Sequence, residues 1–164
     1  MDWHLAQLNV ARLLAPVDDP AIADFYDNLD NMNSLAERSP GYVWRLQTDE
    51  GDATALHPID DDELIIINLT VWEDVQALAD YVFRSDHAAF LRRRGEWFER
   101  YGSAYLALWW VPAGTLPTID DALARLAHIE QHGPTPTAFT FARRFAPPDD
   151  GSPIDADVND VCLA

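Results

Sequence analysis

The chain has 164 residues, a formal net charge of −17 and 48% hydrophobic residues, and it contains arginine but no lysine. That length is enough for one domain with a hydrophobic core, and the composition is typical of a soluble globular protein. Such acidity argues against nucleic acid or an anionic membrane as a partner, because both are bound by basic surfaces.

Two further features bear on the location of the protein in the cell. No apolar run approaches the roughly 20 residues that span a bilayer, and the N-terminus lacks the basic and apolar regions of a signal peptide. Cys162 is the one cysteine, so no intrachain disulfide can form, which fits a reducing compartment. We therefore expect a cytoplasmic protein.

Hydrophobic periodicity predicts strands and helices along most of the chain. Residues 4–10 alternate in the manner of a strand, and Asp19 followed by Pro20 is a good N-cap and first turn for a helix over 20–38. The most hydrophobic run, 63–72, is rich in β-branched residues and predicts the central strand. Further strands are predicted at 42–47 and 104–111, a final strand or extended arm at 138–145, and helices at 73–83, 87–100 and 118–132.

The order of these elements predicts an α+β protein with the ferredoxin-like split β-α-β plan. In that plan a four-stranded antiparallel sheet carries its helices on one face. The other face would then be bare, and an apolar face of that kind needs cover. We expect two such sheets to cover each other in a homodimer, leaving a cavity between sheet and loops. The domain is predicted to span residues 3–145, and the Pro- and Asp-rich tail, 146–164, to be disordered.

Polar residues on one face of the predicted sheet mark a candidate pocket. If helices cover the face that carries Ile65 and Ile67, the opposite face presents amides, a hydroxyl and an indole inside an apolar chamber, as ligand sites do. Burying such groups costs free energy unless they are hydrogen-bonded, so bonds between them or to a dimer partner explain them equally well. The predicted substrate-binding residues here are Gln7, Asn9, Thr70 and Trp72, joined by Arg45 and Trp110 from neighbouring strands, and Asn68 on the same face is a predicted catalytic residue.

His87 is the best candidate for acid–base catalysis, because the ordinary pKa of imidazole is near neutrality. Asn68 is the candidate that orients the substrate or stabilises an enolate. Arg93 is a candidate for binding an anionic group at the pocket mouth, and Trp97 for aromatic contact. The structural alternatives are a helix cap for His87 and core packing for the tryptophans. We expect no metal site, phosphate loop or serine nucleophile, because no cluster or motif for them is evident.

Several separated segments resemble the DUF3291 family: HLAQLNVARL, SLAERSPGYVWRL, NLTVWEDVQALADYVFRSDHAAFLRRRGEWFE and LALWWVPAGTLPTIDDALARL. The family consists of bacterial proteins of undefined function within the dimeric α/β-barrel superfamily, and the resemblance covers about residues 3–145. It implies a ferredoxin-like half-barrel that pairs into a dimeric α/β barrel. It supplies no established catalytic residues, so the site residues above come from physical reasoning alone.

The resemblance also sets the expected range of functions. The superfamily includes antibiotic-biosynthesis monooxygenases without cofactors, isomerase- and cyclase-like enzymes, stress-response proteins and haem enzymes. We expect an enzyme that acts without a cofactor on an apolar or aromatic small molecule, as a monooxygenase, isomerase or cyclase of secondary metabolism. A non-catalytic dimeric ligand-binding or stress-response protein is the alternative. A haem enzyme with His87 or His4 as the axial ligand is a second alternative.

Overall fold

The computed structural model of the protein describes residues 2–148, 153 and 154. Among the helices described, none combines the length and the apolar character that crossing a lipid bilayer requires. The elements are β1 (Trp3–Arg12), η1 (Pro20–Ile22), α1 (Ala23–Arg38), β2 (Tyr42–Arg45), β3 (Ile65–Trp72), α2 (Val75–Arg84), α3 (His87–Arg93), η2 (Arg94–Glu96), β4 (Leu106–Pro112), α4 (Ile119–His132), β5 (Arg144–Phe145) and β6 (Pro153–Ile154).

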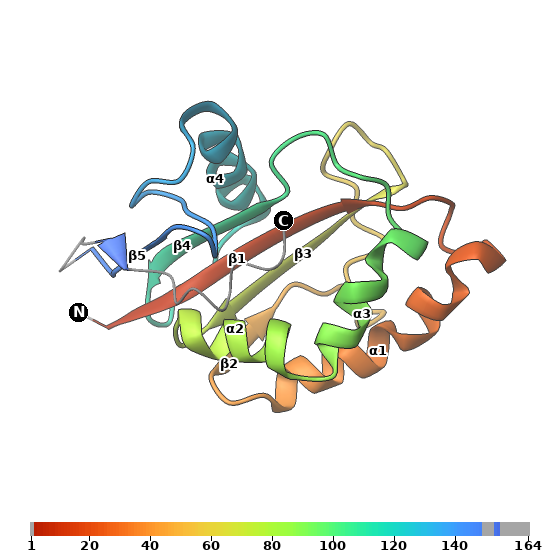
Figure 1. The fold of residues 1–164 in the computed structure, drawn as a ribbon, viewed down its shortest axis with the longest axis horizontal. Coiled ribbons are helices and arrows are strands. Elements are labelled where there is room, and N and C mark those ends of the chain that lie inside the picture. Colours follow the sequence, from red (N-terminus) through yellow and green to blue (C-terminus); the bar gives the residue numbers. More distant parts are fainter. Residues whose placement is uncertain (1, 149–152, 155–164) are drawn as a thin grey trace.

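The four long strands form one antiparallel sheet in the order β2-β3-β1-β4 (Figure 1). Together with the sequence order β1-α1-β2-β3-α2-β4, this is the ferredoxin-like topology, so the predicted fold class is confirmed. The register of the two central strands places Gln7 opposite Thr70 and Asn9 opposite Asn68. The four polar residues therefore lie on the same face of adjacent strands.

Local signals start the helices where the sequence predicts them. The Asp19 carboxylate accepts a hydrogen bond of 2.8 Å from the backbone N–H of Ala21, with Pro20 in the first turn. Thr118 and Asp121 form a complete capping box at the start of α4. At α3, the Ser85 hydroxyl accepts from the His87 N–H at 3.2 Å.

The third helix is shorter than predicted. It ends at Arg93, not near Arg100, and a 3-10 turn follows it. The reason is backbone pairing, because Trp97 and its successors leave the helical path to extend beside the end of β1. The Leu14 N–H donates to the Trp97 carbonyl at 2.8 Å, and the Glu99 N–H donates to the Arg12 carbonyl at 2.9 Å.

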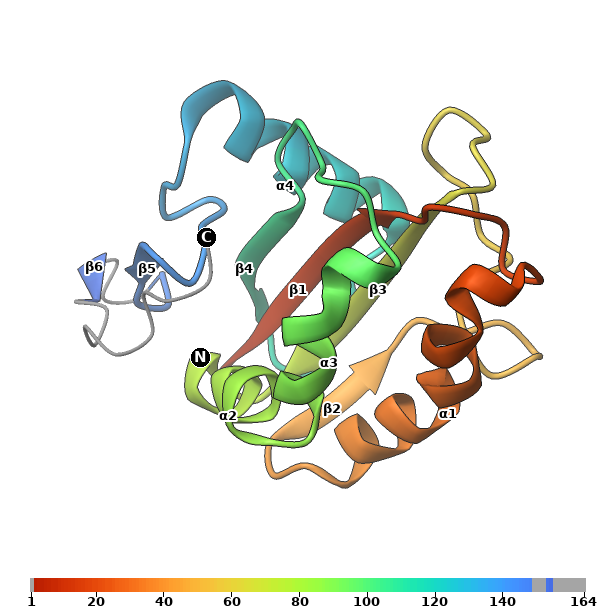
Figure 2. The same ribbon diagram turned by 45° about the vertical axis from the view of Figure 1, so that its right-hand side comes forward.

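Helices cover both faces of the sheet, which corrects the prediction that they lie on one face. α1, α2 and α3 lie on the side that carries Gln7 and Thr70, here called the polar face, and α4 lies on the other side, the aliphatic face (Figures 1 and 2). The amphipathic pattern of α4 explains the difference, because its apolar stripe needs a surface to pack on. The aliphatic face packs Ala6, Leu8, Val10, Ile65, Ile67, Leu69 and Val71 against Ala122, Leu123, Leu126 and Ile129.

The sheet face that a homodimer was expected to bury is already covered by α4. The expected dimer was to cover a bare sheet face, but Leu69 and Val71 on the aliphatic face are already only 1% and 0% exposed within one chain. A dimer of this protein stays a prediction that a light-scattering mass tests. The interface of such a dimer would not include the aliphatic face, which α4 already covers.

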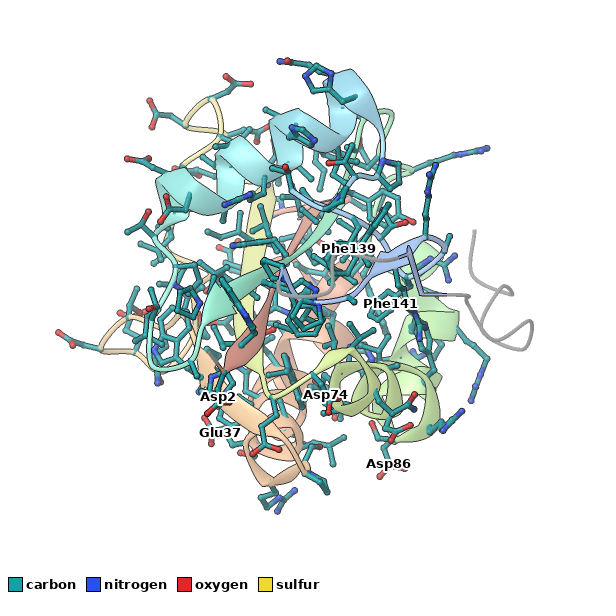
Figure 3. The ribbon with its side chains drawn as sticks, turned by 90° about the vertical axis from the view of Figure 1, so that its left-hand side faces the viewer. Asp2, Glu37, Asp74, Asp86, Phe139 and Phe141 are labelled. Atoms are coloured by element: carbon teal, nitrogen blue, oxygen red, sulfur yellow. The ribbon has the colours of Figure 1, made fainter. Side chains whose placement is uncertain are left out.

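The segment after α4 runs along the outer side of β4 as an extended arm. Phe139 exchanges two backbone hydrogen bonds of 2.8 Å with Leu108, and Figure 3 shows Phe139 and Phe141 on this arm. Of the two forms predicted for 138–145, a strand or an extended arm, the structure has the arm, with isolated bridges at Ala138, Phe139 and Thr140 and the short strand β5, which pairs with β6. The predicted disordered tail, 146–164, lies largely outside the described residues, and so does Cys162.

Gly41 fixes how the turn after α1 meets α2. Its φ of +79° is a left-handed conformation, and a Cβ added there would lie 2.4 Å from the Ala77 Cβ. We predict that Gly41→Ala lowers the free energy of unfolding by about 1–3 kcal/mol more than Gly51→Ala does, because of this overlap. Gly51 is the matched control, since its φ is +93° and nothing lies within 4 Å of the added carbon. Urea unfolding of both variants measures the difference, and equal losses would contradict the steric explanation.

Candidate functional site

Asn68 marks an opening in the middle of the polar face. It lies on β3, a central strand, and it faces the side covered by α1, α2 and α3, where a side chain is ordinarily buried. Its neighbours along the strand, Leu69 and Thr70, are buried, yet Asn68 itself is exposed. The helix layer therefore does not close over the sheet at this point.

Two separate hydrophobic clusters on the polar face explain the opening. The first lies toward α2 and includes Leu5, Trp72 and Leu78. The second lies at the far end of the strands and is built on Leu13 and Trp97. Asn68 and its cross-strand partner Asn9 lie between the two clusters and belong to neither. We call the open space above these two residues the chamber.

Three buried side chains form a hydrogen-bonded trio beside the chamber. The indole Nε1–H of Trp72 donates to the Thr70 hydroxyl oxygen at 2.9 Å, and the Thr70 hydroxyl donates to Gln7 Oε1 at 2.8 Å. The exposed fractions of Trp72, Thr70 and Gln7 are 0%, 5% and 6%. The trio therefore satisfies most of its polar groups internally, as buried polar groups must.

The two asparagines are not bonded to one another. Asn9 Nδ2 donates to the Tyr105 carbonyl at 3.4 Å, a long hydrogen bond. Within the described residues, the Asn68 carboxamide makes no side-chain hydrogen bond. Of the two explanations offered for Asn9 and Asn68, mutual bonding is thus absent, and Asn68 is left with its donors and acceptor facing the chamber.

His87 lies in the helix layer with one ring nitrogen engaged. Its Nδ1 is 3.2 Å from the Val82 carbonyl oxygen, which only accepts, so Nδ1 carries the proton and Nε2 is the basic nitrogen of the neutral ring. Burial lowers the pKa of His87, and the hydrogen bond to the Val82 carbonyl offsets that shift in part. The ring is therefore neutral at pH 7 and able to accept a proton.

Tyr81 on α2 connects His87 to the sheet, and sequence reasoning missed it. Its ring stacks on Trp72 with centroids 5.1 Å apart and meets the His87 ring at 4.8 Å. Its hydroxyl donates to the Met32 carbonyl on α1 at 3.2 Å, and burial raises its pKa. The available signal was helical spacing, since Tyr81 falls three residues after Leu78 and six after Val75, on the buried stripe of α2.

Two other candidate residues lie in ion pairs away from the chamber floor. The buried Arg45 guanidinium donates from Nε to Glu37 Oε1 at 2.9 Å, and from Nη1 to the Gly51 carbonyl at 2.7 Å. Arg93 is exposed and donates to both Glu96 and Asp24, so it joins α3 to α1. Arg45 thus has one carboxylate and one carbonyl as partners, and Arg93 has two carboxylates.

The remaining aromatic candidates are packed. Trp97 is 2% exposed, stacks on Phe90, and has the Arg93 guanidinium 4.8 Å above its ring. Trp110 is half-buried, and its Nε1–H donates to the Phe145 carbonyl at 2.8 Å, which fixes it under the C-terminal arm. Of the two histidines considered as haem ligands, His4 lies opposite Val111 on the aliphatic face, outside the chamber.

Two other features lie apart from the chamber. His128 and His132 are one helical turn apart on α4 with ring centroids 4.8 Å apart, a spacing that the sequence analysis overlooked, and His128 Nε2 is 2.7 Å from the Thr135 hydroxyl. Among the described residues, no group of three or more His, Cys, Asp or Glu side chains could hold a metal ion. An open groove along α2 is lined by residues that include Ser39, Gly41, Glu73, Asp74, Tyr81 and Ser85.

Comparison with known proteins identifies a family for this sequence but no activity. Residues 4–154 match the family model described as "Domain of unknown function (DUF3291)". None of the curated proteins matches. The match covers nearly all of the described residues.

Solved structures give only distant similarities. A mutant of SnoaB, a cofactor-independent oxygenase from Streptomyces nogalater, is 15% identical with a TM-score of 0.45, over 70% of this chain and 98% of that one. A conserved protein from Methanosarcina mazei Go1 is 12% identical with a TM-score of 0.45, over 66% and 90%. NE2512, a protein of unknown function from Nitrosomonas europaea, is 14% identical with a TM-score of 0.43, over 71% and 96%. Similarity at this level transfers neither residues nor activity.

The buried imidazole predicts a pH dependence of stability. Because the pKa of His87 is lower in the folded protein than the ordinary 6.5, the unfolded chain takes up the proton first as the pH falls. The free energy of unfolding should therefore fall from about pH 6.5 down to the folded-state pKa, by about 1.4 kcal/mol for each unit between the two values. Urea unfolding at several pH values between 7.5 and 5 measures this slope.

His87→Phe should remove this component of the slope, whereas His132→Phe, which replaces an exposed imidazole on α4, should leave it in place. Acidic residues titrate mainly below this window and do not obscure it. A slope that is the same in His87→Phe and in the unmodified protein would show that His87 is not buried in its neutral form.

Proposed function

The chain belongs to the DUF3291 family, and we propose that it is a small-molecule enzyme that moves a proton on an apolar, aromatic substrate bound in the chamber. The reaction classes that this chemistry serves are cofactor-independent oxygenation, isomerisation and cyclisation. The alternative is a protein that binds the same kind of ligand without converting it.

The observation that carries the proposal is the exposed Asn68 in the middle of a helix-covered sheet face. A carboxamide there can donate to a ligand oxygen, and hydrophobic clusters built on Trp72 and Trp97 flank the opening at both ends. Apolar walls with a few polar groups of fixed orientation are typical of small-molecule sites.

The reaction would begin with the neutral His87 ring. Its Nε2 accepts a proton from a substrate carbon next to a carbonyl group, and the resulting enolate oxygen accepts hydrogen bonds from Asn68 and Asn9. Return of the proton to a different carbon gives an isomer. Attack of the enolate carbon on a second carbonyl of the substrate closes a ring. Addition of dioxygen, with return of the proton, gives a hydroperoxide.

Proton abstraction can be tested without the natural substrate. In D₂O, the protein should exchange the C2 hydrogens of 1-indanone for deuterium faster than an equal concentration of free imidazole, as followed by NMR. His87→Gln should slow the exchange by about 10²- to 10⁴-fold, the usual contribution of a positioned base. Asn68→Leu should slow it by about 10²- to 10³-fold, as loss of an oxyanion donor does.

His132→Gln is the matched control, because it removes an exposed imidazole on the opposite side of the sheet. An exchange rate in the unmodified protein that equals the rate of His87→Gln would contradict the proposed catalysis. If 1-indanone then still binds, and Asn68→Leu weakens that binding, the protein is a binder and not an enzyme.

A further inference from the structure

Gln7 is almost completely buried, yet its amide nitrogen has no hydrogen-bond partner in the part of the chain that the structure describes. The residue is 6% exposed, and its Oε1 accepts the Thr70 hydroxyl at 2.8 Å. Within the described residues, Nε2 makes no hydrogen bond. Nor does Nε2 belong to the side-chain atoms that are both fully buried and unpaired, so it still reaches open space. Two N–H donors thus remain free on a side chain that the fold otherwise encloses.

The trio fixes which end of the Gln7 carboxamide faces that space. An indole N–H can only donate, so the Thr70 oxygen must accept from Trp72. The single hydroxyl hydrogen of Thr70 then has to be donated elsewhere, and Gln7 Oε1 is the acceptor. If the carboxamide were reversed, Gln7 Nε2 and not Oε1 would face the Thr70 hydroxyl. The hydrogen of that hydroxyl would then have no acceptor among the side chains described around it. Trp72 therefore sets, through Thr70, the direction in which the Gln7 donors point.

The open space reached by these donors is the chamber. Gln7 lies on β1, an interior strand, on the same face as Asn9 and directly across from Thr70. Its Oε1 side is occupied by Thr70, so Nε2 points away from that residue. Gln7 and Asn9 are two residues apart on the same face of β1, and Asn9 lies across from the exposed Asn68. The space that Nε2 reaches therefore adjoins the opening at Asn68.

We infer that Gln7 is a ligand-binding residue that selects molecules with a carbonyl oxygen, and that Thr70 and Trp72 are positioning residues that hold its donors toward the chamber. This inference rests on the proposed function, because it names the oxygen acceptor in the same chamber. It changes the role expected for Trp72 and Thr70, whose buried side chains act on the ligand only through Gln7. An apolar ring system with a carbonyl group is the ligand class that fits.

Matched pairs of probes test the donor directly. 9-Fluorenone and fluorene differ by a carbonyl in place of a methylene group, and so do 1-indanone and indane. Quenching of tryptophan fluorescence gives the Kd of each probe. The unmodified protein should bind each ketone more tightly than its hydrocarbon, and Gln7→Met should reduce that preference by about 3- to 10-fold, the contribution of one neutral hydrogen bond. Gln131→Leu, on the exposed side of α4, should leave the preference unchanged.

The positioning role predicts a second pattern. Thr70→Val removes the hydroxyl that orients Gln7 and should reduce the preference for the ketone even though Gln7 is intact, whereas Thr70→Ser retains the hydroxyl and should preserve it. A merely structural effect would weaken both members of a pair alike and leave their ratio unchanged. If Gln7→Met fails to fold because Thr70 loses its acceptor, the triple variant Gln7→Met, Thr70→Val, Trp72→Phe removes the trio without leaving a partner unpaired.

The outcomes separate the two proposals. One outcome is that the ketones bind in preference to the hydrocarbons and that Asn68→Leu reduces this preference, whereas the Gln7 and Thr70 variants do not. The inference about Gln7 would then be wrong, and the proposed ligand site would stand. Loss of the preference in Thr70→Ser as well as in Thr70→Val would overturn the positioning role. If none of the four probes binds, both the chamber as a ligand site and the role of Gln7 are overturned.

Discussion

Polar side chains on a face that helices must cover constrain this molecule more than any other feature. A buried donor or acceptor without a partner costs about 1–3 kcal/mol, so a helix layer can close over such groups only where they satisfy one another. Trp72 and Thr70 do so, and Gln7 does so through its oxygen, in two hydrogen bonds, and α2 packs over that end of the sheet. Asn9 and Asn68 form no such bond with each other, and there the layer stays open. The chamber is thus a consequence of which polar groups are paired.

The packing of α4 covers the aliphatic face of the sheet within a single chain. Ferredoxin-like sheets with one bare face need a second copy to bury it, but here the strands are enclosed on both sides. The arm that carries Phe139 closes the β4 edge by backbone pairing with Leu108, which protects a sheet edge from adventitious pairing. The four polar residues of the candidate site come from β1 and β3 of one chain.

Periodicity and capping chemistry in the sequence were sufficient to predict the sheet, its strands and most helix starts, because these depend on neighbours within a few residues. Asp19, Thr118 and the run ending at Trp72 are examples. Alternation along β3 likewise separated Asn68 and Thr70 from the aliphatic face. What the sequence could not supply was long-range placement. The end of α3 depends on pairing with β1, α4 on the choice of a sheet face, and the partners of Arg45 and Arg93 on contacts between distant elements.

The electrostatics of the molecule favour a ligand that enters neutral. With a net charge of −17, the protein repels anions over distances of about a Debye length, and Arg93, the last residue of α3, is paired with Glu96 and Asp24. The chamber instead offers carboxamide donors, and the proposed base, His87, is an imidazole whose pKa burial lowers. Such dipoles bind a neutral carbonyl weakly and bind the enolate formed from it more strongly. On the proposed function, negative charge would develop only after binding, on an oxygen next to these donors. Binding that is stronger in the transition state than in the ground state is what accelerates a reaction.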